Sequence, residues 1–225
     1  MQSKIELSPE YGLLEVILAP GEKLVAESGA MVAMDSSVKL TSKARGGVLK
    51  GLKRKMLGGE SFFQSTYEAE IQPGRVLLAP GAPGDIKEVL LNSGQSLMIQ
   101  SSCYMASTPD VQLDTKWGGA KGFFSGTGMF LLKATGPGTV WITSFGAMAI
   151  QEIAGGFTVD TGHIVAFDET LQYHISKVGG LKGLLFSGEG LVAKFTGHGQ
   201  LHIQTRNPAS FAAFLHPFRP VEKSN

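Results

Sequence analysis

This sequence contains a single cysteine, and a cysteine is the side chain that acts most readily as a nucleophile. Cys103 and His163 each follow an apolar segment at matching places in two stretches of the chain, and Ala30 stands at the matching place in a third. A thiol and an imidazole within hydrogen-bond reach could act as nucleophile and base. A cysteine followed by Tyr104 and Met105 is also typical of a small buried apolar residue, and we favour this interpretation.

Histidines provide the candidates for a metal site. His198 and His202 lie four residues apart in HGQLH, a spacing that suits a metal on a helix, but the intervening glycine indicates a turn and an extended strand. His174 lies in the alternating segment LQYHIS without a cluster of Asp, Glu or Cys nearby. The sequence therefore predicts neither a metal nor a cofactor.

Carboxylates recur at one place in the chain. Glu27 and Asp160, with Gln100 at the third matching place, could form an acid and base pair. Each of them precedes Ser or Thr at the end of a predicted strand, where such side chains usually accept hydrogen bonds from turn amides. We favour the turn interpretation, and the sequence predicts no catalytic residue.

Three Gly-Gly loops carry Lys50, Lys121 and Lys182. Glycine-rich amides and a lysine bind phosphate in other proteins. The GxxxxGK[ST] pattern is missing here, and no helix is predicted after two of the loops. We interpret the three loops as surface hairpin turns.

A basic segment at residues 48–57, VLKGLKRKML, is an insertion that occurs only in the first part of the chain. Its apolar residues fall near one helical stripe, and its basic residues Lys50, Lys53, Arg54 and Lys55 are the candidate interaction residues. An amphipathic basic helix can lie on an anionic membrane or in the groove of a partner protein. The alternative is a solvated helix face packed against the β body.

Composition excludes several classes of protein. A net charge of +1, with 43% hydrophobic and 17% charged residues, produces no field that would attract nucleic acid or anionic lipid by default. One cysteine cannot form an intrachain disulfide, which fits a reducing compartment. The N-terminal segment MQSKIELSPEYG lacks a secretory signal, and no run of about 18 apolar residues is present, so we expect a cytoplasmic protein.

The same order of motifs occurs three times along the chain, which marks a repeated structural unit. The first motif covers residues 27–33, 100–106 and 160–166, and glycine-rich turns follow it at similar spacing in each unit. The units span about 12–80, 86–146 and 150–206, followed by a C-terminal tail at 207–225. Between the turns, alternating segments such as GTVWITSF and GQLHIQTR predict half-buried strands.

These patterns predict one all-β domain of three tandem repeats with approximate threefold symmetry, in which each unit covers the hydrophobic face of its neighbours. Two short helices are expected, one at 48–57 and one at 208–215. The second has Pro208 at its first position after the capping residue Asn207. Residual strand edges would allow a homo-oligomer.

Four segments carry a resemblance to a known family: GGESFF (58–63), LAPGAPGDI (78–86), VDTGHIVAF (159–167) and SGEGLVAKFTGHGQLHIQTR (187–206). They closely resemble the bacterial family related to the yeast "altered inheritance of mitochondria" protein twenty-four, over nearly the whole chain. The resemblance implies a fold similar to three fused subunits of the tryptophan RNA-binding attenuation protein, an antiparallel double-stranded β-helix. It also implies an association with membrane-organising assemblies, and it provides no catalytic motif.

The resulting functional hypothesis is a non-enzymatic scaffold or interaction protein with an unknown protein partner and peripheral membrane contact. Two alternatives stay open at this point. One is a small-ligand or nucleic-acid binding module, although nucleic acid is not expected from the charge, and fold analogy alone is weak evidence. The other is an enzyme with a site at the pseudo-threefold axis.

Overall fold

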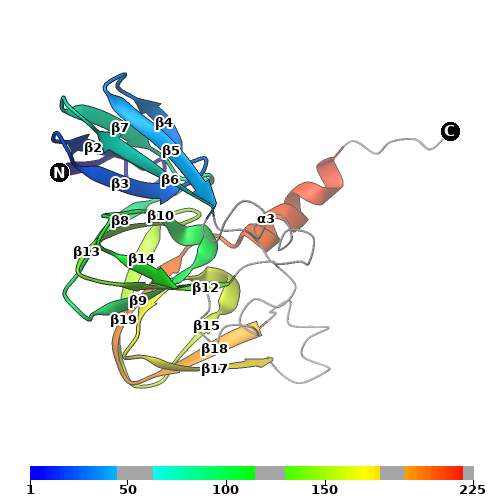
Figure 1. Ribbon diagram of the computed structural model, residues 1–225. Coiled ribbons are helices and arrows are strands. Elements are labelled where there is room, and N and C mark those ends of the chain that lie inside the picture. The colour runs from blue at the N-terminus through cyan, green and yellow to red at the C-terminus, as the bar shows by residue number, and fades with distance from the viewer. Residues whose placement is uncertain (45–62, 115–129, 178–190, 220–225) are drawn as a thin grey trace.

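The computed structural model describes residues 1–44, 63–114, 130–177 and 191–219, and most of them lie in β-strands (Figure 1). The all-β prediction is therefore confirmed. The predicted helix at 48–57 lies outside the described residues.

The strands follow each other along the chain in three groups. The first group is β1 (Gln2–Glu6), β2 (Leu13–Leu18), β3 (Lys23–Glu27), β4 (Met31–Met34), β5 (Val38–Ala44), β6 (Phe63–Ala69) and β7 (Gly74–Leu78). The second is β8 (Ile86–Leu91), β9 (Ser96–Gln100), the 3-10 turn η1 (Ser101–Cys103), β10 (Tyr104–Ser107), β11 (Gln112–Asp114), β12 (Leu131–Thr135) and β13 (Gly138–Thr143). The third is β14 (Met148–Ala154), β15 (Phe157–Asp160), the 3-10 turn η3 (Thr161–His163), β16 (Ile164–Asp168), β17 (Gln172–Lys177), β18 (Leu191–Thr196) and β19 (His198–Gln204).

The described strands form four antiparallel sheets. Their strand orders are β1-β2-β7-β4, then β5-β6-β3-β10-β13-β8, then β11-β12-β9-β16-β19-β14, and finally β15-β18-β17. The two six-stranded sheets each combine strands from two successive groups. Figure 1 shows the first group at one end of the body and β15, β17 and β18 at the other.

Alternation of apolar and polar residues explains why these segments form strands. In β2, Leu14, Val16 and Leu18 are fully buried, whereas Ile17 between them is exposed. By contrast, every residue of β9 and β10 is buried, because neighbouring side chains of these strands pack in different hydrophobic clusters, such as Tyr104 in the second and Met105 in the first.

Three hydrophobic clusters form the core, and each receives residues from more than one group of strands. Met105, Ala106 and Trp141 of the second group pack in the first cluster with Leu14 and Leu24. Val165 and Ala166 of the third group pack in the second cluster. Full burial of a large apolar side chain stabilises a fold by about 1.5–3 kcal/mol, so these contacts hold adjacent groups together.

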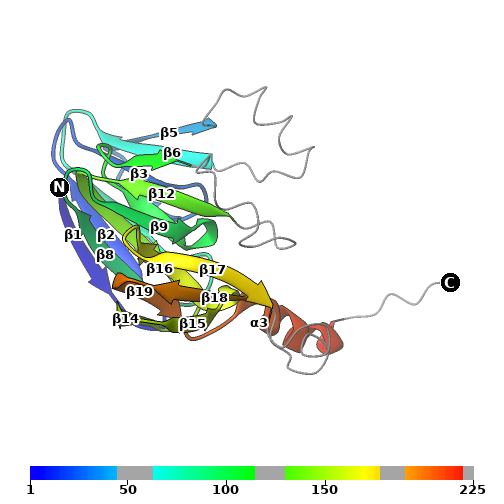
Figure 2. The same ribbon diagram turned by 90° about the horizontal axis from the view of Figure 1, so that it is seen from below.

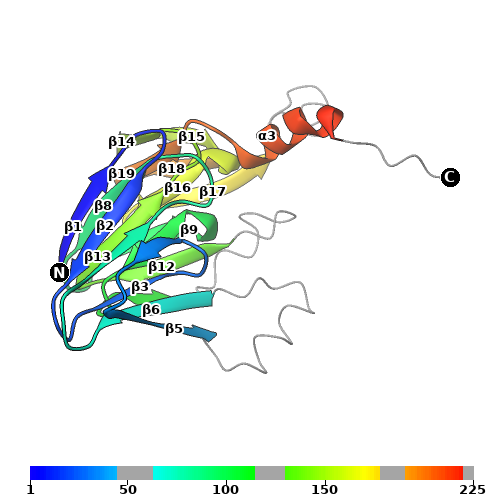
Figure 3. The ribbon, with the colours of Figure 1, turned by 90° about the horizontal axis from the view of Figure 1, so that it is seen from above.

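The C-terminal helix α3 (Pro208–Leu215) confirms the prediction for this segment, and the short turn η4 (His216–Phe218) follows it. The side chain of Asn207 accepts hydrogen bonds from the backbone amides of Ala209 (2.9 Å) and Ser210 (3.4 Å). Figures 2 and 3 show α3 projecting from the side of the body opposite the N-terminus.

A close backbone contact connects the segment before β8 with the segment after β13. Gly84 forms a parallel bridge with Gly146, and the Asp85 amide donates a hydrogen bond to the Gly146 carbonyl at 3.1 Å. A Cβ at Gly84 would lie 1.7 Å from the carbonyl oxygen of Ser144. Only glycine allows these two backbones to approach so closely.

We predict that Gly84→Ala destabilises the protein by about 1–3 kcal/mol, the usual cost of forcing atoms into packed structure. Gly81→Ala is the matched control, because a Cβ at Gly81 meets nothing within 4 Å. Chemical denaturation followed by circular dichroism measures both changes. Equal stability of the two variants would contradict the prediction.

Candidate functional site

Two short 3-10 turns present the residues that sequence analysis selected as chemical candidates. Turns η1 and η3 follow β9 and β15, and their N-cap residues Gln100 and Asp160 share the backbone angles φ −62° and ψ 132°. The Asp160 carboxylate accepts a hydrogen bond from the Gly162 amide at 2.7 Å. The turn interpretation is therefore confirmed for Asp160.

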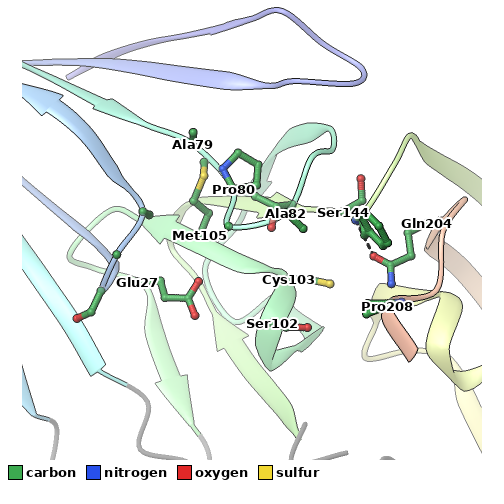
Figure 4. Close-up of a pocket in the computed structure, with 16 residues that line it drawn as sticks. Glu27, Ala79, Pro80, Ala82, Ser102, Cys103, Met105, Ser144, Gln204 and Pro208 are labelled. Carbon is green, nitrogen blue, oxygen red and sulfur yellow. Dashed lines mark hydrogen bonds between the residues drawn. The ribbon is translucent and has the colours of Figure 1, made fainter. Parts of the chain in front are cut away.

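A cavity of about 500 Å³ lies where the first two groups of strands meet the C-terminal segment (Figure 4). Its walls come from residues 27–30, 79–82, 102, 103, 105, 143–145, 204 and 208. Most of these residues are apolar or small, and Glu27, Ser102 and Gln204 contribute polar groups. The volume falls within the range that small-molecule sites occupy.

Cys103 lines this cavity, and Figure 4 shows its sulfur pointing toward Gln204 and Pro208. Burial raises the pKa of the thiol to about 12, and the negative charge of Glu27 adds to the shift, whereas a hydrogen bond with Ser102 opposes it. The thiol therefore stays protonated at neutral pH. A protonated buried thiol is a poor nucleophile.

The imidazole of His163 forms a structural contact with the backbone of β19. Its Nδ1 lies 2.7 Å from the backbone carbonyl of Gln204, to which a protonated Nδ1 donates. The Gln204 side chain donates to the Gly162 carbonyl at 2.9 Å and accepts from the Phe145 amide at 2.9 Å. These bonds attach η3 to β19, and His163 does not line the cavity that contains Cys103. The nucleophile and base hypothesis therefore receives no geometric support.

The histidines considered as metal ligands also receive no geometric support. His198 and His202 lie on β19, where a rise of about 3.3 Å per residue separates their Cα atoms by roughly 13 Å. His174 is exposed on β17, opposite Lys194. Within residues 1–44, 63–114, 130–177 and 191–219, no group of three His, Cys, Asp or Glu side chains could hold a metal ion.

His202 is a noteworthy residue that sequence reasoning did not single out as buried. It is 3% exposed, and its Nδ1 has no hydrogen-bond partner among the described residues. Burial lowers its pKa below 6.5, although Asp168 and Glu152 oppose the shift. The folded protein therefore holds this imidazole in its neutral form near pH 7.

Strand register explains the environment of His202. In β13 the residue opposite Glu88 is Trp141, and its indole Nε1–H donates to the Glu88 carboxylate at 3.0 Å. In β19 His202 lies opposite Ile150, which offers no acceptor. A second cavity of about 500 Å³ adjoins His202 and is lined by charged residues that include Lys87 and Asp168. Comparing the last motif of each repeat could have found this exchange of Trp for His.

The basic residues Lys50, Lys53, Arg54 and Lys55 lie outside the described residues. The loop lysines Lys121 and Lys182 also lie outside them. In the described part of the chain, no helix is both long and apolar enough to cross a membrane.

Comparison with known proteins supports the resemblance seen in the sequence. The family described as "Mitochondrial biogenesis AIM24" matches residues 3–206. The chain belongs to the AIM24 family. An uncharacterized protein of Streptococcus pyogenes serotype M6 is 31% identical over 240 residues, covering 100% of this chain and 93% of that protein. An X-ray crystal structure of a Streptococcus pyogenes protein is similar, with a TM-score of 0.81 and 29% identity over 97% of this chain and 99% of that chain.

We predict that the native protein resists thiol reagents at pH 7.5, because Cys103 is 3% exposed and its pKa is about 12. Labelling with a chromogenic disulfide reagent should release no colour from the folded protein. The same reagent in denaturant should report one thiol per chain. Rapid labelling of the folded protein would show that the cavity admits a reactive thiolate.

We predict a loss of stability in acid that depends on His202. The pKa of His202 is lowered in the folded state, so the unfolded state binds a proton more readily and the free energy of unfolding falls as pH drops below 6.5. The variant His202→Leu should lose this part of the pH dependence. Denaturant unfolding at pH 7.5 and 5.5 measures it, and His174→Leu controls for the loss of an exposed histidine. An unchanged slope in His202→Leu would refute the assignment.

Proposed function

We propose that this protein is a non-enzymatic interaction protein, a scaffold that assembles with membrane-associated complexes. The observation that carries the proposal is the α3 surface, defined as Phe211, Phe214, Leu215 and Phe218. These four side chains are between 46% and 73% exposed, and no residue of α3 is buried. Contiguous exposed apolar side chains usually mark a binding surface.

Within the part of the chain that the structure describes, the α3 surface has few contacts that would explain it as part of the core. Phe211 contacts Phe145 edge to face at 5.2 Å, and Phe214 lies against Phe218 at 5.6 Å. From Pro208 to Phe218 the only ionisable side chain is His216. A helix of eight residues is marginal in water on its own, so a partner that covered these phenylalanines would stabilise it.

The state of the reactive groups also supports a role other than catalysis. Cys103 has a raised pKa, His163 is bound to a backbone carbonyl, and Asp160 accepts a turn amide. Each of these three side chains therefore contributes to the stability of the fold.

We also infer that three units of one topology compose the body, as the sequence motifs indicate. Strand pairing supports this: β10 lies between β3 and β13, and β16 lies between β9 and β19. Each of β4, β10 and β16 carries a register shift at one place, after Met31, Tyr104 and Ile164. The likeness to the tryptophan RNA-binding attenuation protein and the threefold symmetry stay predictions.

The double variant Phe214→Ser, Phe218→Ser tests the scaffold proposal. Affinity capture from the cells that make the protein, followed by mass spectrometry, should recover binding proteins with the native chain and lose them with the variant. Leu90→Ser is the matched control, because Leu90 is 69% exposed on β8 and lies outside the α3 surface. Recovery of the same binding proteins with the native chain and with the double variant would refute the role of α3.

A further inference from the structure

One strand of the body is exposed where its counterparts are buried. All four residues of β4 are exposed, and Val32 is 57% exposed. All residues of β10 are buried, with Met105 at 1%, and in β16 Val165 is at 0%. The difference between these strands therefore lies in their neighbours, because their sequences are similarly apolar.

Each buried strand pairs with a strand of the preceding unit and also packs a side chain in the core of that unit. Strand β10 pairs with β3 through Ala106 opposite Ala26, and β16 pairs with β9 through Ala166 opposite Ile99. Met105 packs in the first hydrophobic cluster and Val165 in the second, so each inserts into the core of the unit before its own. Among the described strands, β4 pairs with β7 alone, and its other edge is unpaired.

The opposite end of the body has the complementary edge. Strand β15 occupies the place of β3 and β9, since Glu27, Gln100 and Asp160 end these three strands. Whereas β3 and β9 each have two neighbours, β15 has β18 as its one partner among the described strands, and Phe157 is 37% exposed. Strands β4 and β15 lie in different sheets, so one copy does not join its own two edges.

Charge distinguishes β4 from the other strands that border the described sheets. Natural proteins usually protect an edge strand with a charged residue or a proline. Strands β1, β5, β8, β11, β14, β15 and β17 each contain at least one charged residue. Strand β4, Met31-Val32-Ala33-Met34, contains none. An uncharged apolar edge of this kind is suited to pairing with another chain.

We propose that copies of this chain join head to tail, with β4 of one copy pairing antiparallel to β15 of the next. Continuing the two pairings within the chain gives the register: Ala33 lies opposite Val159, and Met34 opposite Thr158. Val32 then inserts into the third hydrophobic cluster of the next copy, beside Val159 and Phe195. This inference rests on the three-unit architecture proposed above and is independent of the α3 surface.

The contact is heterologous, because one surface of a copy meets a different surface of the next. Such contacts produce closed rings when the rotation between copies closes, and filaments when it does not. The same pairing occurs twice within the chain, so each added copy extends the row of units by three.

The first test is the variant Val32→Lys, which places a charge at an exposed position of β4. Analytical ultracentrifugation should find the native chain as a multimer and the variant as a monomer at the same concentration. Leu90→Lys, at a similarly exposed apolar position, should keep the multimer. Circular dichroism should show that both variants are folded. A monomeric native chain, or a multimer that Val32→Lys leaves intact, would overturn the proposal.

Disulfide crosslinking tests the register. Residues directly opposite each other in antiparallel strands have Cβ atoms about 4.5–5.5 Å apart, close to the disulfide range. Mixing Met34→Cys protein with Thr158→Cys protein under mild oxidation should yield one dimer band, and the double variant should yield multiples or closed rings. Native Cys103 is buried and should not react. Dimers from Met34→Cys protein alone would show an isologous contact and overturn the head-to-tail arrangement.

These experiments can refute the scaffold proposal for α3 and the head-to-tail pairing of β4 with β15 independently of each other. The variant Phe214→Ser, Phe218→Ser should keep the multimer and lose the binding proteins. Loss of the multimer in that variant would show that α3, and not β4, joins the copies, and would overturn the inference drawn here.

Discussion

The fold depends on the antiparallel pairing of a strand from one unit with a strand from the next. A buried backbone amide or carbonyl without a partner costs free energy comparable to a lost hydrogen bond. Strand β10 is buried throughout and β16 is buried from Ile164 to Phe167, so their backbone groups must be satisfied on both sides. Strands β3 and β9 meet that requirement on one side, and β13 and β19 on the other.

The same pairing determines where cavities occur. The first cavity lies where residues 27–30 of one unit approach Ser102 and Cys103 of the next. The second lies at the following junction, where His202 stands in place of Trp141. A smaller side chain at a junction leaves space and loses a hydrogen bond, since Glu88 is matched by Ile150. Differences between the junctions are thus differences of single side chains on a shared backbone arrangement.

Local features of the fold were predictable from the sequence because their causes are local. Pro208 after Asn207 predicted the start of α3, and alternation in GTVWITSF predicted β13. Asp160 was correctly predicted to bind a turn amide, because that bond spans two residues. The burial of His202 depends on strands distant in sequence, so HGQLH by itself contains no sign of it, and only comparison with the motif that contains Trp141 could have indicated it. That Cys103 lines the first cavity and His163 does not likewise depends on how the units are placed, although their motif positions match.

The exposure of β4 shows why a residue pattern alone cannot reveal an interface. Met31-Val32-Ala33-Met34 has the apolar character of Tyr104-Met105-Ala106-Ser107, so both segments indicate a buried strand. Only the tertiary arrangement shows that, among the described strands, β10 lies between two neighbours and β4 has one. In a chain that worked alone, a charge at Val32 would cost little stability and would protect the edge from pairing. That β4 carries no charge while seven other border strands do is best explained if β4 is covered in the working assembly.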